Sequence, residues 1–476
     1  MRQALIGALA GARGLRRAGL AALMAATAIP AAAQSLTDTF VLAYRNSGLL
    51  EQNRALLRAA DEDVAQAVAA LYPIINWAVD AGYSENGLTT NRLTTTAALT
   101  GQITLWDGGQ NRLAIDAAQE NVLAVREGLV AVEQQMLLAA VQAHMNVLSA
   151  RETVSLRQSN VQLITRELRA SQDRFEVGEI TRTDVSLAEA RLALARSQLS
   201  VAEGDLAIAR EAYKRAVGVY PENLQVPGPA PMPATTPEEA KSRAARSHPA
   251  VRQAKREVTV AEINAARLDA ARNPSLSLGA RLGVSADTLN QNVIAGQPRA
   301  DLISRSVTLG LSGPVYQAGR IDSLVRQQVA RGEAARASLL LTTDQVVENA
   351  GNAFAQLLVA NAVLESSQRQ VIAQQQFFSG TREEATLGAR TTLDVLNAEQ
   401  DLLDARTLAV TSVNDRVVAQ YALLAAQGLL TVDYLNLGIP TYDPSAYYNA
   451  VESAPISSRQ GQALDRVLKS LKLEDR

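Results

Sequence analysis

The sequence predicts a mainly α-helical chain that carries a small membrane-type β-sheet and is built from two tandem repeats. The chain matches itself at an offset of 210 residues, which places Gly178 on Gly388 and Asp184 on Asp394, and about a third of the positions that follow are identical. In each half, two segments alternate between apolar and small polar residues, and a very long stretch without proline follows them. The alternation is typical of β-strands, and the proline-free stretches are typical of long helices.

The first 33 residues have the pattern of a secretory signal peptide. Arg13, Arg16 and Arg17 precede the apolar run 20–29, and the alanines at 31–33 fit a cleavage site. This run is shorter than the ~20 residues that a membrane-spanning helix needs. Because the chain has no cysteine, lipid attachment at the mature N-terminus is excluded. We therefore expect an exported protein with a cleaved signal and no lipid anchor.

The composition argues against an enzyme and against nucleic-acid binding. The chain has 476 residues, no cysteine and two histidines, which leaves little for thiol, histidine or metal chemistry, so no cofactor and no metal are expected. Its 46 basic and 48 acidic residues are dispersed, which is unlike a nucleic-acid footprint. The mean hydropathy of −0.03 excludes a polytopic helical membrane protein but not a β-barrel, whose strands alternate.

The repeat defines the expected domain organisation. The first repeat covers 34–218, with a β-hairpin at about 73–107 and a helical hairpin that turns at Gly178. A proline-rich connection at 219–237 leads to the second repeat, 238–428, with a β-hairpin at about 274–315 and a turn at Gly388. The remaining residues, 429–476, form a C-terminal tail that we expect to pack around the middle of the long helices.

The β-hairpins have one apolar and one small-polar face. Each segment has roughly the 9–11 residues that cross a bilayer obliquely, so we expect the apolar face to contact lipid. The residues predicted to face lipid are Ile75, Trp77, Val79, Leu99, Ile103, Leu278 and Leu309. A soluble two-sided sheet gives the same alternation, but it would need a core for the apolar face. Four strands cannot close a barrel and open edges are not tolerated in lipid, so several chains must share one barrel.

The helices indicate more than one neighbour. The proline-free stretch 110–177 would form a helix roughly 100 Å long at 1.5 Å per residue. In the next helix, apolar rows that start at Val185, Leu187 and Ala188 recur every seven residues. The rows of Val185 and Ala188 form one seam, and the row of Leu187 lies beyond a polar row, so the helix has two apolar seams. Without the β-hairpins, this pattern would favour a coiled-coil scaffold.

With these features, the sequence resembles the TolC-like outer-membrane channel proteins of Gram-negative bacteria, which serve efflux and type I secretion. The most specific parts are Phe175-Glu-Val-Gly-Glu-Ile-Thr-Arg-Thr-Asp184 and the stretch 386–399 around the second turn, supported by the strand-to-helix joints 105–109 and 313–319. The resemblance implies a homotrimer: a twelve-stranded β-barrel in the outer membrane, four strands per chain, continuous with a twelve-helix periplasmic α-barrel.

The resemblance also implies a function and partners. It implies a passive exit duct of a tripartite system for multidrug efflux or type I protein secretion. A periplasmic adaptor (membrane fusion) protein and an inner-membrane pump of the ABC, RND or MFS type open the duct. The resemblance also implies that the protein contacts outer-membrane lipid and extends into the periplasm.

Roles for residues around the two turns are carried over by position. The implied adaptor-docking residues are Val177, Gly178, Leu387 and Gly388, and both glycines also suit helix C-caps that need positive φ. The implied gating links are Arg390, Thr183 and Asp184. The implied pore constriction comprises Asp394, Asn397, Asp401 and Asp404. Asn397 replaces an acidic residue of the family pattern, and Ala385 replaces an aromatic one that Phe175 keeps in the first turn. For each charge, a solvated helix face is the alternative.

Two other functions stay open at this stage. One is a non-conducting helical scaffold of the cell envelope, against which the membrane-type hairpins argue. The other is an envelope enzyme, but the sequence has no nucleophile motif, phosphate loop or metal-ligand cluster. A lone histidine such as His144 within an apolar helix is interpreted as a packing residue.

Overall fold

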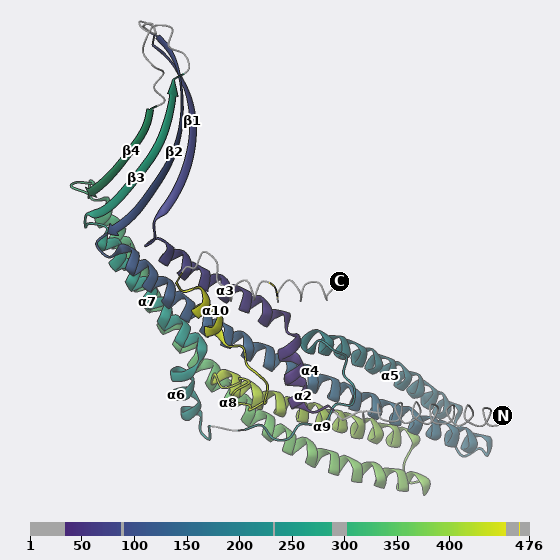
Figure 1. The fold of residues 1–476 in the computed structure, drawn as a ribbon. Helices are drawn as coiled ribbons and strands as arrows, with labels where there is room; N and C mark the ends of the chain where they lie inside the picture. The colour runs from purple at the N-terminus through teal and green to yellow at the C-terminus, as the bar shows by residue number, and fades with distance from the viewer. Residues whose placement is uncertain (1–33, 87–89, 232–233, 288–301, 454–465, 467–476) are drawn as a thin grey trace, which may run out of the picture. The chain divides into compact units, whose positions relative to one another are not determined.

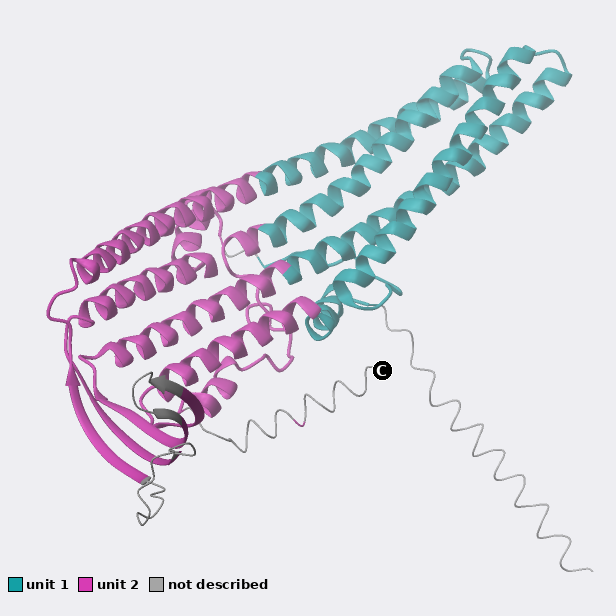
Figure 2. Ribbon diagram, turned by 90° about the horizontal axis from the view of Figure 1, so that it is seen from above, with its two compact units in different colours: residues 1–47, 136–233, 356–422 teal, residues 48–135, 234–355, 423–476 magenta. Residues whose placement is uncertain are grey.

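The computed structural model of the chain describes residues 34–86, 90–231, 234–287, 302–453 and 466. The predicted signal peptide and, apart from 466, the last twenty residues lie outside the described residues. The chain forms two compact units (Figure 2). The first unit comprises 1–47, 136–233 and 356–422, and the second comprises 48–135, 234–355 and 423–476.

The first unit is helical (Figure 1). It contains α2 and α5, the C-terminal parts of α4 and α8, and most of α9. These helices have the bounds Leu36–Asn46 (α2), Gln110–Glu176 (α4), Arg182–Val217 (α5), Arg320–Thr386 (α8) and Thr392–Ala426 (α9).

The second unit combines a sheet with helices. It contains the N-terminal parts of α4 and α8, three shorter helices and a fourth close to the C-terminus. Its helices are Gly48–Ala69 (α3), Pro237–Ser247 (α6), Pro249–Ala270 (α7) and Pro444–Val451 (α10). Its strands are Ile74–Asn86 (β1), Thr90–Trp106 (β2), Ser275–Asp287 (β3) and Leu302–Ser312 (β4).

The long helices α4 and α8 have the same length, 67 residues each. Neither helix contains proline, so no residue interrupts its ladder of backbone hydrogen bonds. At 1.5 Å per residue, each helix is about 100 Å long. Among the described residues, no helix is both long enough and apolar enough to span a membrane.

The four strands form one antiparallel sheet in the order β1-β2-β3-β4, which joins the two halves of the chain through β2 and β3. Residues paired across neighbouring strands point to the same side of a sheet. Trp77 pairs with Leu99, Ile103 with Leu278, and Leu278 with Leu309. The register therefore puts all seven residues predicted to face lipid on one face. β1 and β4 are the two edge strands.

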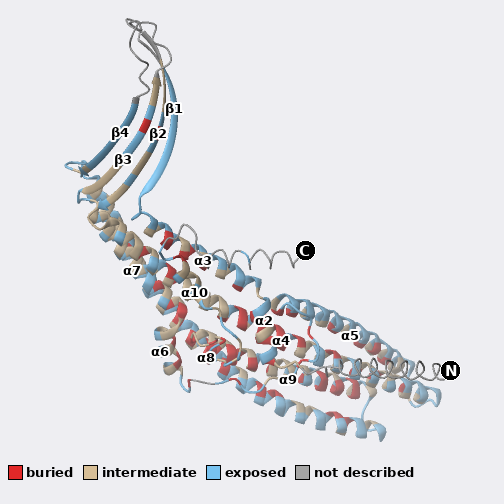
Figure 3. Ribbon diagram, in the orientation of Figure 1, coloured by how far each residue is buried: buried red, intermediate tan, exposed pale blue. Residues whose placement is uncertain are grey.

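The apolar face of this sheet is largely uncovered within the chain. Trp77 is 79% exposed and Leu309 is 64% exposed, whereas Ile103 and Leu278 are half-buried. Burial is concentrated in the helices instead (Figure 3). A two-sided soluble sheet would have buried these side chains in its own chain, so the exposed apolar face favours a lipid contact.

A buried polar cluster fixes α2 in the first unit. The hydroxyl of Thr39 lies 2.9 Å from Nδ1 of His144 and 3.1 Å from the hydroxyl of Tyr213. Nε2 of His144 lies 2.9 Å from the carbonyl oxygen of Gln225, which can only accept, so the neutral ring carries its proton on Nε2. Burial lowers the pKa of His144. His144 is thus a packing residue that ties α2, α4, α5 and the connection after α5 together.

The helix α5 shows both apolar seams of the heptad pattern. One seam packs within the chain, since Ala188, Leu192 and Ala195 are buried. The other seam does not: Val201 is 62% exposed and Ile208 is 70% exposed. This helix therefore presents an apolar row that its own chain leaves uncovered.

In the second unit, the segment after α9 packs on α3 and α4. The amide of Val432 donates to Oε1 of Glu133 at 2.6 Å, and the hydroxyl of Tyr447 donates to Oε1 of Glu62 at 2.6 Å. The guanidinium of Arg126 lies over the ring of Tyr448, 5.2 Å from its centroid. Polar and cation–π contacts of this kind anchor the tail between 432 and 448.

Candidate functional site: the paired helical turns

The two helical hairpins of the first unit end in turns with the same backbone geometry. Gly178 has φ 81° and Gly388 has φ 77°. The amide after each glycine donates to the carbonyl five residues earlier, at 2.9 Å in both turns, which is the Schellman pattern. A Cβ atom at either glycine would meet nothing within 4 Å, so the positive φ requires glycine there and crowding does not.

A capping box follows each glycine. Asp184 accepts from the amide of Thr181 at 3.0 Å and from its hydroxyl at 2.8 Å, and Asp394 accepts from Thr391 at the same two distances. The amides of both aspartates donate back to the threonine hydroxyls. The hydrogen bonds from the backbone and side chain of Thr391 lower the pKa of Asp394. These hydrogen bonds favour the carboxylate form of Asp394, and each aspartate is engaged at the start of its own helix.

The spacing Thr-x-x-Asp in both turns is visible in the sequence and could have identified these caps. It was not used in the sequence analysis, which assigned Asp184 and Asp394 only to gating and pore roles. A residue can do both, because each carboxylate still has free lone-pair directions.

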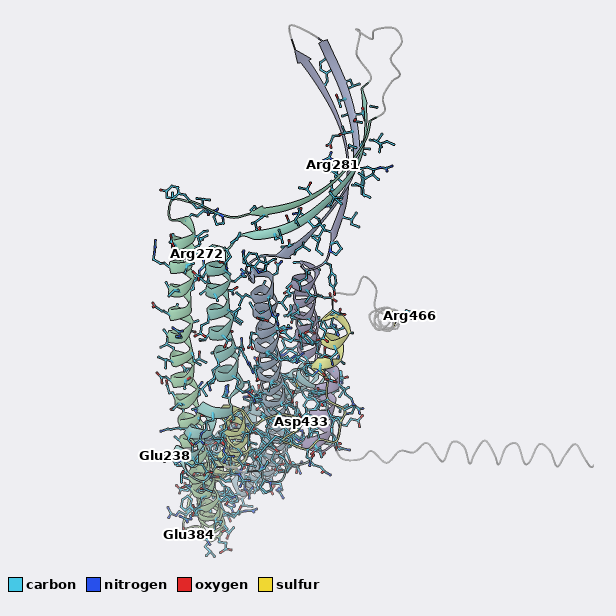
Figure 4. The ribbon with its side chains drawn as sticks, turned by 60° about the vertical axis from the view of Figure 1, so that its left-hand side comes forward. Glu238, Arg272, Arg281, Glu384, Asp433 and Arg466 are labelled. Carbon is cyan, nitrogen blue, oxygen red and sulfur yellow. The ribbon has the colours of Figure 1, made fainter. Side chains whose placement is uncertain are left out.

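Arg390 is paired within its own turn. Its Nε donates to Oε2 of Glu384 at 2.9 Å, and this hydrogen bond raises the pKa of Arg390. Figure 4 labels Glu384 near the end of α8. Within the described part of one chain, no hydrogen bond joins Arg390 to Thr183 or Asp184, which belong to the first turn. A link from Arg390 to those residues would have to form between chains.

The residues predicted for the constriction follow one another along α9. Asp401 and Asp404 are exposed, and Oδ1 of Asp404 accepts from the side-chain Nε2 of Gln400 at 2.9 Å. Asn397 accepts from Nη2 of Arg191 on α5 at 3.0 Å, so it ties the two hairpins of the chain together. Asp401 and Asp404 thus leave carboxylates open to solvent, and Asn397 serves as a bridge.

Two large apolar side chains are exposed at the turns. Val177 is 73% exposed and Leu387 is 85% exposed, one just before each glycine. Exposed apolar residues at corresponding positions of two repeats are a feature that a protein partner could cover.

The site also contains a buried carboxyl that the sequence analysis missed. Glu399 on α9 is 5% exposed, and its Oε1 accepts from Nδ2 of Asn160 on α4 at 2.6 Å. Its other oxygen is buried, and within the described residues it has no hydrogen-bond partner. Burial raises the pKa of Glu399 to about 7, although the Asn160 hydrogen bond lowers it. The helical spacing of Glu399 from the buried Leu396 and Leu402 is the signal that could have placed it on the packed face.

The described residues contain no group of three or more histidines, aspartates and glutamates placed to hold a metal ion. The turns instead have capped helix starts, an ion pair within the second turn and two exposed apolar residues. A comparison with known proteins identifies the setting of these contacts.

The family model of the outer membrane efflux proteins matches residues 41–219 and 241–429, which is most of both repeats. The chain belongs to this family. It is 34% identical over 422 residues to the outer membrane efflux protein BepC of Brucella suis, covering 89% of this chain and 91% of BepC. It is 24% identical to the outer membrane protein TolC of Escherichia coli, over 84% of this chain and 83% of TolC. The resemblance found in the sequence is confirmed.

The fold is also that of solved outer-membrane channels. The structure of the Campylobacter jejuni CmeC outer membrane channel matches with a TM-score of 0.73 at 15% identity, covering 88% of this chain and 89% of CmeC. The predicted fold class, mainly helical with four strands per chain, is confirmed. The family is that of the outer membrane efflux proteins.

Proposed function

We propose that this chain is the outer-membrane exit duct of a tripartite export system, for type I protein secretion or multidrug efflux. Three copies form one passive channel, with a twelve-stranded β-barrel in the outer membrane and twelve helices in the periplasm. A periplasmic adaptor and an inner-membrane pump of the ABC, RND or MFS type open it. Family membership and the relatives named outer membrane efflux protein support this function.

The sheet is the observation that carries the proposal. One chain supplies four strands, its edge strands β1 and β4 are open, and its apolar residues share a single exposed face. Open edges are not tolerated in lipid, and four strands are too few to close a barrel. Joining β4 of one chain to β1 of the next, three times, removes every edge and turns the apolar face towards lipid.

The helices support the same assembly. The uncovered row on α5, with Val201 and Ile208, needs an apolar neighbour. The helix α8 has exposed apolar residues of its own, including Val359 and Ile372. In a ring of three chains, α5 of one chain would pack against α8 of the next, which repeats the arrangement of α9 and α4 in the described chain.

The turns then form the end of the duct that meets the adaptor. Val177, Gly178, Leu387 and Gly388 make the docking surface, and the exposure of its two apolar side chains supports that role. Rings of Asp394, Asn397, Asp401 and Asp404 line the constriction, and the three rings of aspartates favour cations. Arg390 of one chain, on leaving Glu384, would reach Thr183 and Asp184 of the neighbour and hold the end closed.

The proposed location is the outer membrane of a Gram-negative bacterium, with the helices in the periplasm. The chain reaches it through a signal peptide removed after residue 33 and carries no lipid anchor. The proposal includes no cofactor, no metal and no nucleic acid, because transport is passive and the energy comes from the pump.

Two measurements on the purified protein test the proposal. Its mass in mild detergent should correspond to a trimer, and single-channel recording in a planar bilayer should show discrete openings. A monomer that inserts stably into membranes would overturn the shared barrel. A trimer that never conducts would leave only a helical scaffold of the envelope.

A further inference from the structure

One arginine lies on the apolar face of the sheet. Arg305 of β4 pairs with Leu282, and its flanking pairs are Ile303 with Val284 and Val307 with Ala280. Leu282 pairs in turn with Leu99, and Leu99 with Trp77. Because paired residues share a side, Arg305 ends a row of three large apolar side chains.

The neighbouring row forms a hollow beside this arginine. It runs from Ile75 through Gly101 and Ala280 to Val307. Its two middle residues, Gly101 and Ala280, have no side chain larger than a methyl group and form the floor of the hollow. The larger side chains around them project further from the sheet and form its walls. The result is an open groove of about 440 Å³. Its lining comprises Ile75, Leu99, Gly101, Ala280, Leu282, Arg305 and Val307, together with Arg281 and Ser306, whose side chains alternation places on the opposite face. A groove with apolar walls and one cation at its rim suits an amphiphile.

Among the described residues of the chain, the charge of Arg305 has no counterpart. Its side chain is exposed, and the described residues give it no hydrogen bond and no ion pair. No carboxylate stands in its row or in the rows on either side of it. Asp80 of β1 lies between Val79 and Ala81 and therefore points to the opposite face. A cation that faces lipid with no partner in its own chain is unfavourable, so an anion from outside the chain would stabilise it.

The position of Arg305 in its strand indicates where that anion comes from. Arg305 is the fourth residue of β4, at the end away from Ser312 and the helix α8 that follows. In the proposed duct this end faces the outer leaflet. The long side chain of arginine can extend along apolar neighbours and bring its guanidinium to the headgroup level. The planar fork of the guanidinium matches two oxygens of a phosphate.

We propose that the groove beside Arg305 is a binding site for a phosphate-bearing lipid of the outer membrane. Arg305 holds the phosphate, and one acyl chain lies over Gly101 and Ala280 between Leu99 and Val307. The site rests on the proposed function, because it requires this face of the sheet to contact lipid. A barrel with three such sites would carry three tightly held lipids.

Lipid retention tests this site directly. The full-length protein is reconstituted in bilayers of a neutral glycolipid, which carries no phosphate, with a minority of phosphatidylglycerol. Native mass spectrometry then counts the phosphatidylglycerol retained per assembly. Arg305→Leu is expected to lower this retention about tenfold, the effect of losing one charge-assisted contact of about 1.4 kcal/mol. Arg305→Lys should fall in between, because it keeps a point charge without the fork.

Arg281 provides the matched control. It lies on β3 (Figure 4) and pairs with Ser306, so it projects from the opposite face of the same sheet. Arg281→Leu is expected to leave retention unchanged. Equal retention in Arg305→Leu and the parent, or equal loss in Arg281→Leu, would overturn the site. Displacement of the lipid by inorganic phosphate alone would also overturn it, since the acyl chain would then contribute nothing.

Conductance separates this proposal from the function of the duct. If the parent protein conducts but its lipid retention is the same with and without Arg305, the lipid site is wrong and the proposed duct still stands. A parent protein that forms no channel would reject the duct, and with it the orientation on which the lipid site depends.

Discussion

Replacing Glu399 by glutamine is expected to stabilise the contact between α4 and α9 above neutral pH and to leave it unchanged in acid. Glu399 is 5% exposed, and only one of its oxygens has a hydrogen-bond partner, Asn160. The charges that act on it are those of Glu167, Arg382 and Arg166. Glutamine has the same shape, can still accept from Asn160 and never ionises.

The magnitude follows from the raised pKa. Burial moves the pKa of Glu399 from 4.5 to about 7, so the folded state favours the neutral acid. The stabilisation is complete below pH 4.5 and is lost as the pH rises through 7. A rise of this size corresponds to at most about 3–4 kcal/mol at 1.36 kcal/mol per pKa unit. The glutamine variant avoids that loss, and its advantage grows over the same pH range.

Hydrogen–deuterium exchange of the full-length protein in detergent measures the effect locally. At about pH 8, amides of α9 near Glu399 should exchange up to about a hundredfold more slowly in Glu399→Gln than in the parent, and at about pH 4.5 the two should agree. Asp401→Asn removes an exposed carboxylate from the same helix and should change little. Equal protection in parent and Glu399→Gln at both pH values would refute the buried-carboxyl reasoning.

Three further predictions concern the membrane face and the turns. Leu99→Arg should cost about 2–4 kcal/mol near mid-bilayer in a liposome folding assay, and Thr100→Arg on the opposite face much less; equal costs would reverse the assigned faces. Asp394→Asn keeps an oxygen for the helix cap but removes the charge, so cation selectivity and block by multivalent cations should fall in planar bilayers; unchanged reversal potentials would place Asp394 off the pore. Arg390→Ala should raise single-channel conductance and let large antibiotics enter cells that carry it. Glu384→Ala, which releases Arg390 for the neighbouring chain, should lower conductance. If both variants conduct like the parent, Arg390 does not hold the channel closed.

The sheet and the turns could be predicted because their sequence signals are local. The alternation in β1 and β2 determines which residues share a face, and a glycine such as Gly178 indicates a positive φ directly. The side of Arg305 follows from the same alternation, since it shares a face with Val307 and Leu309 of β4; it was missed because an arginine does not fit the apolar pattern that identified this face.

Pairings between helices were harder to predict. Glu189 and Glu399 occupy the same place in the repeat, yet Glu189 is exposed and Glu399 is buried. Glu399 lies against α4, where Nδ2 of Asn160 donates to it, and Asn160 is too distant in the chain for residue spacing to reveal this contact. The pairing of Arg390 with Glu384 was missed for a related reason, since a separation of six residues becomes a contact only once the turn is formed.

The equal lengths of α4 and α8 constrain how such a protein can change through evolution. An insertion of one residue would lift one turn by 1.5 Å and rotate it by 100°, which moves its apolar rows away from their partners. A tolerated change must therefore come in whole heptads, must occur in both repeats, and must be matched in α5 and α9, which have 36 and 35 residues. The distance that the helices can bridge would then change in steps of about 10 Å, and lineages with intermediate lengths should be missing.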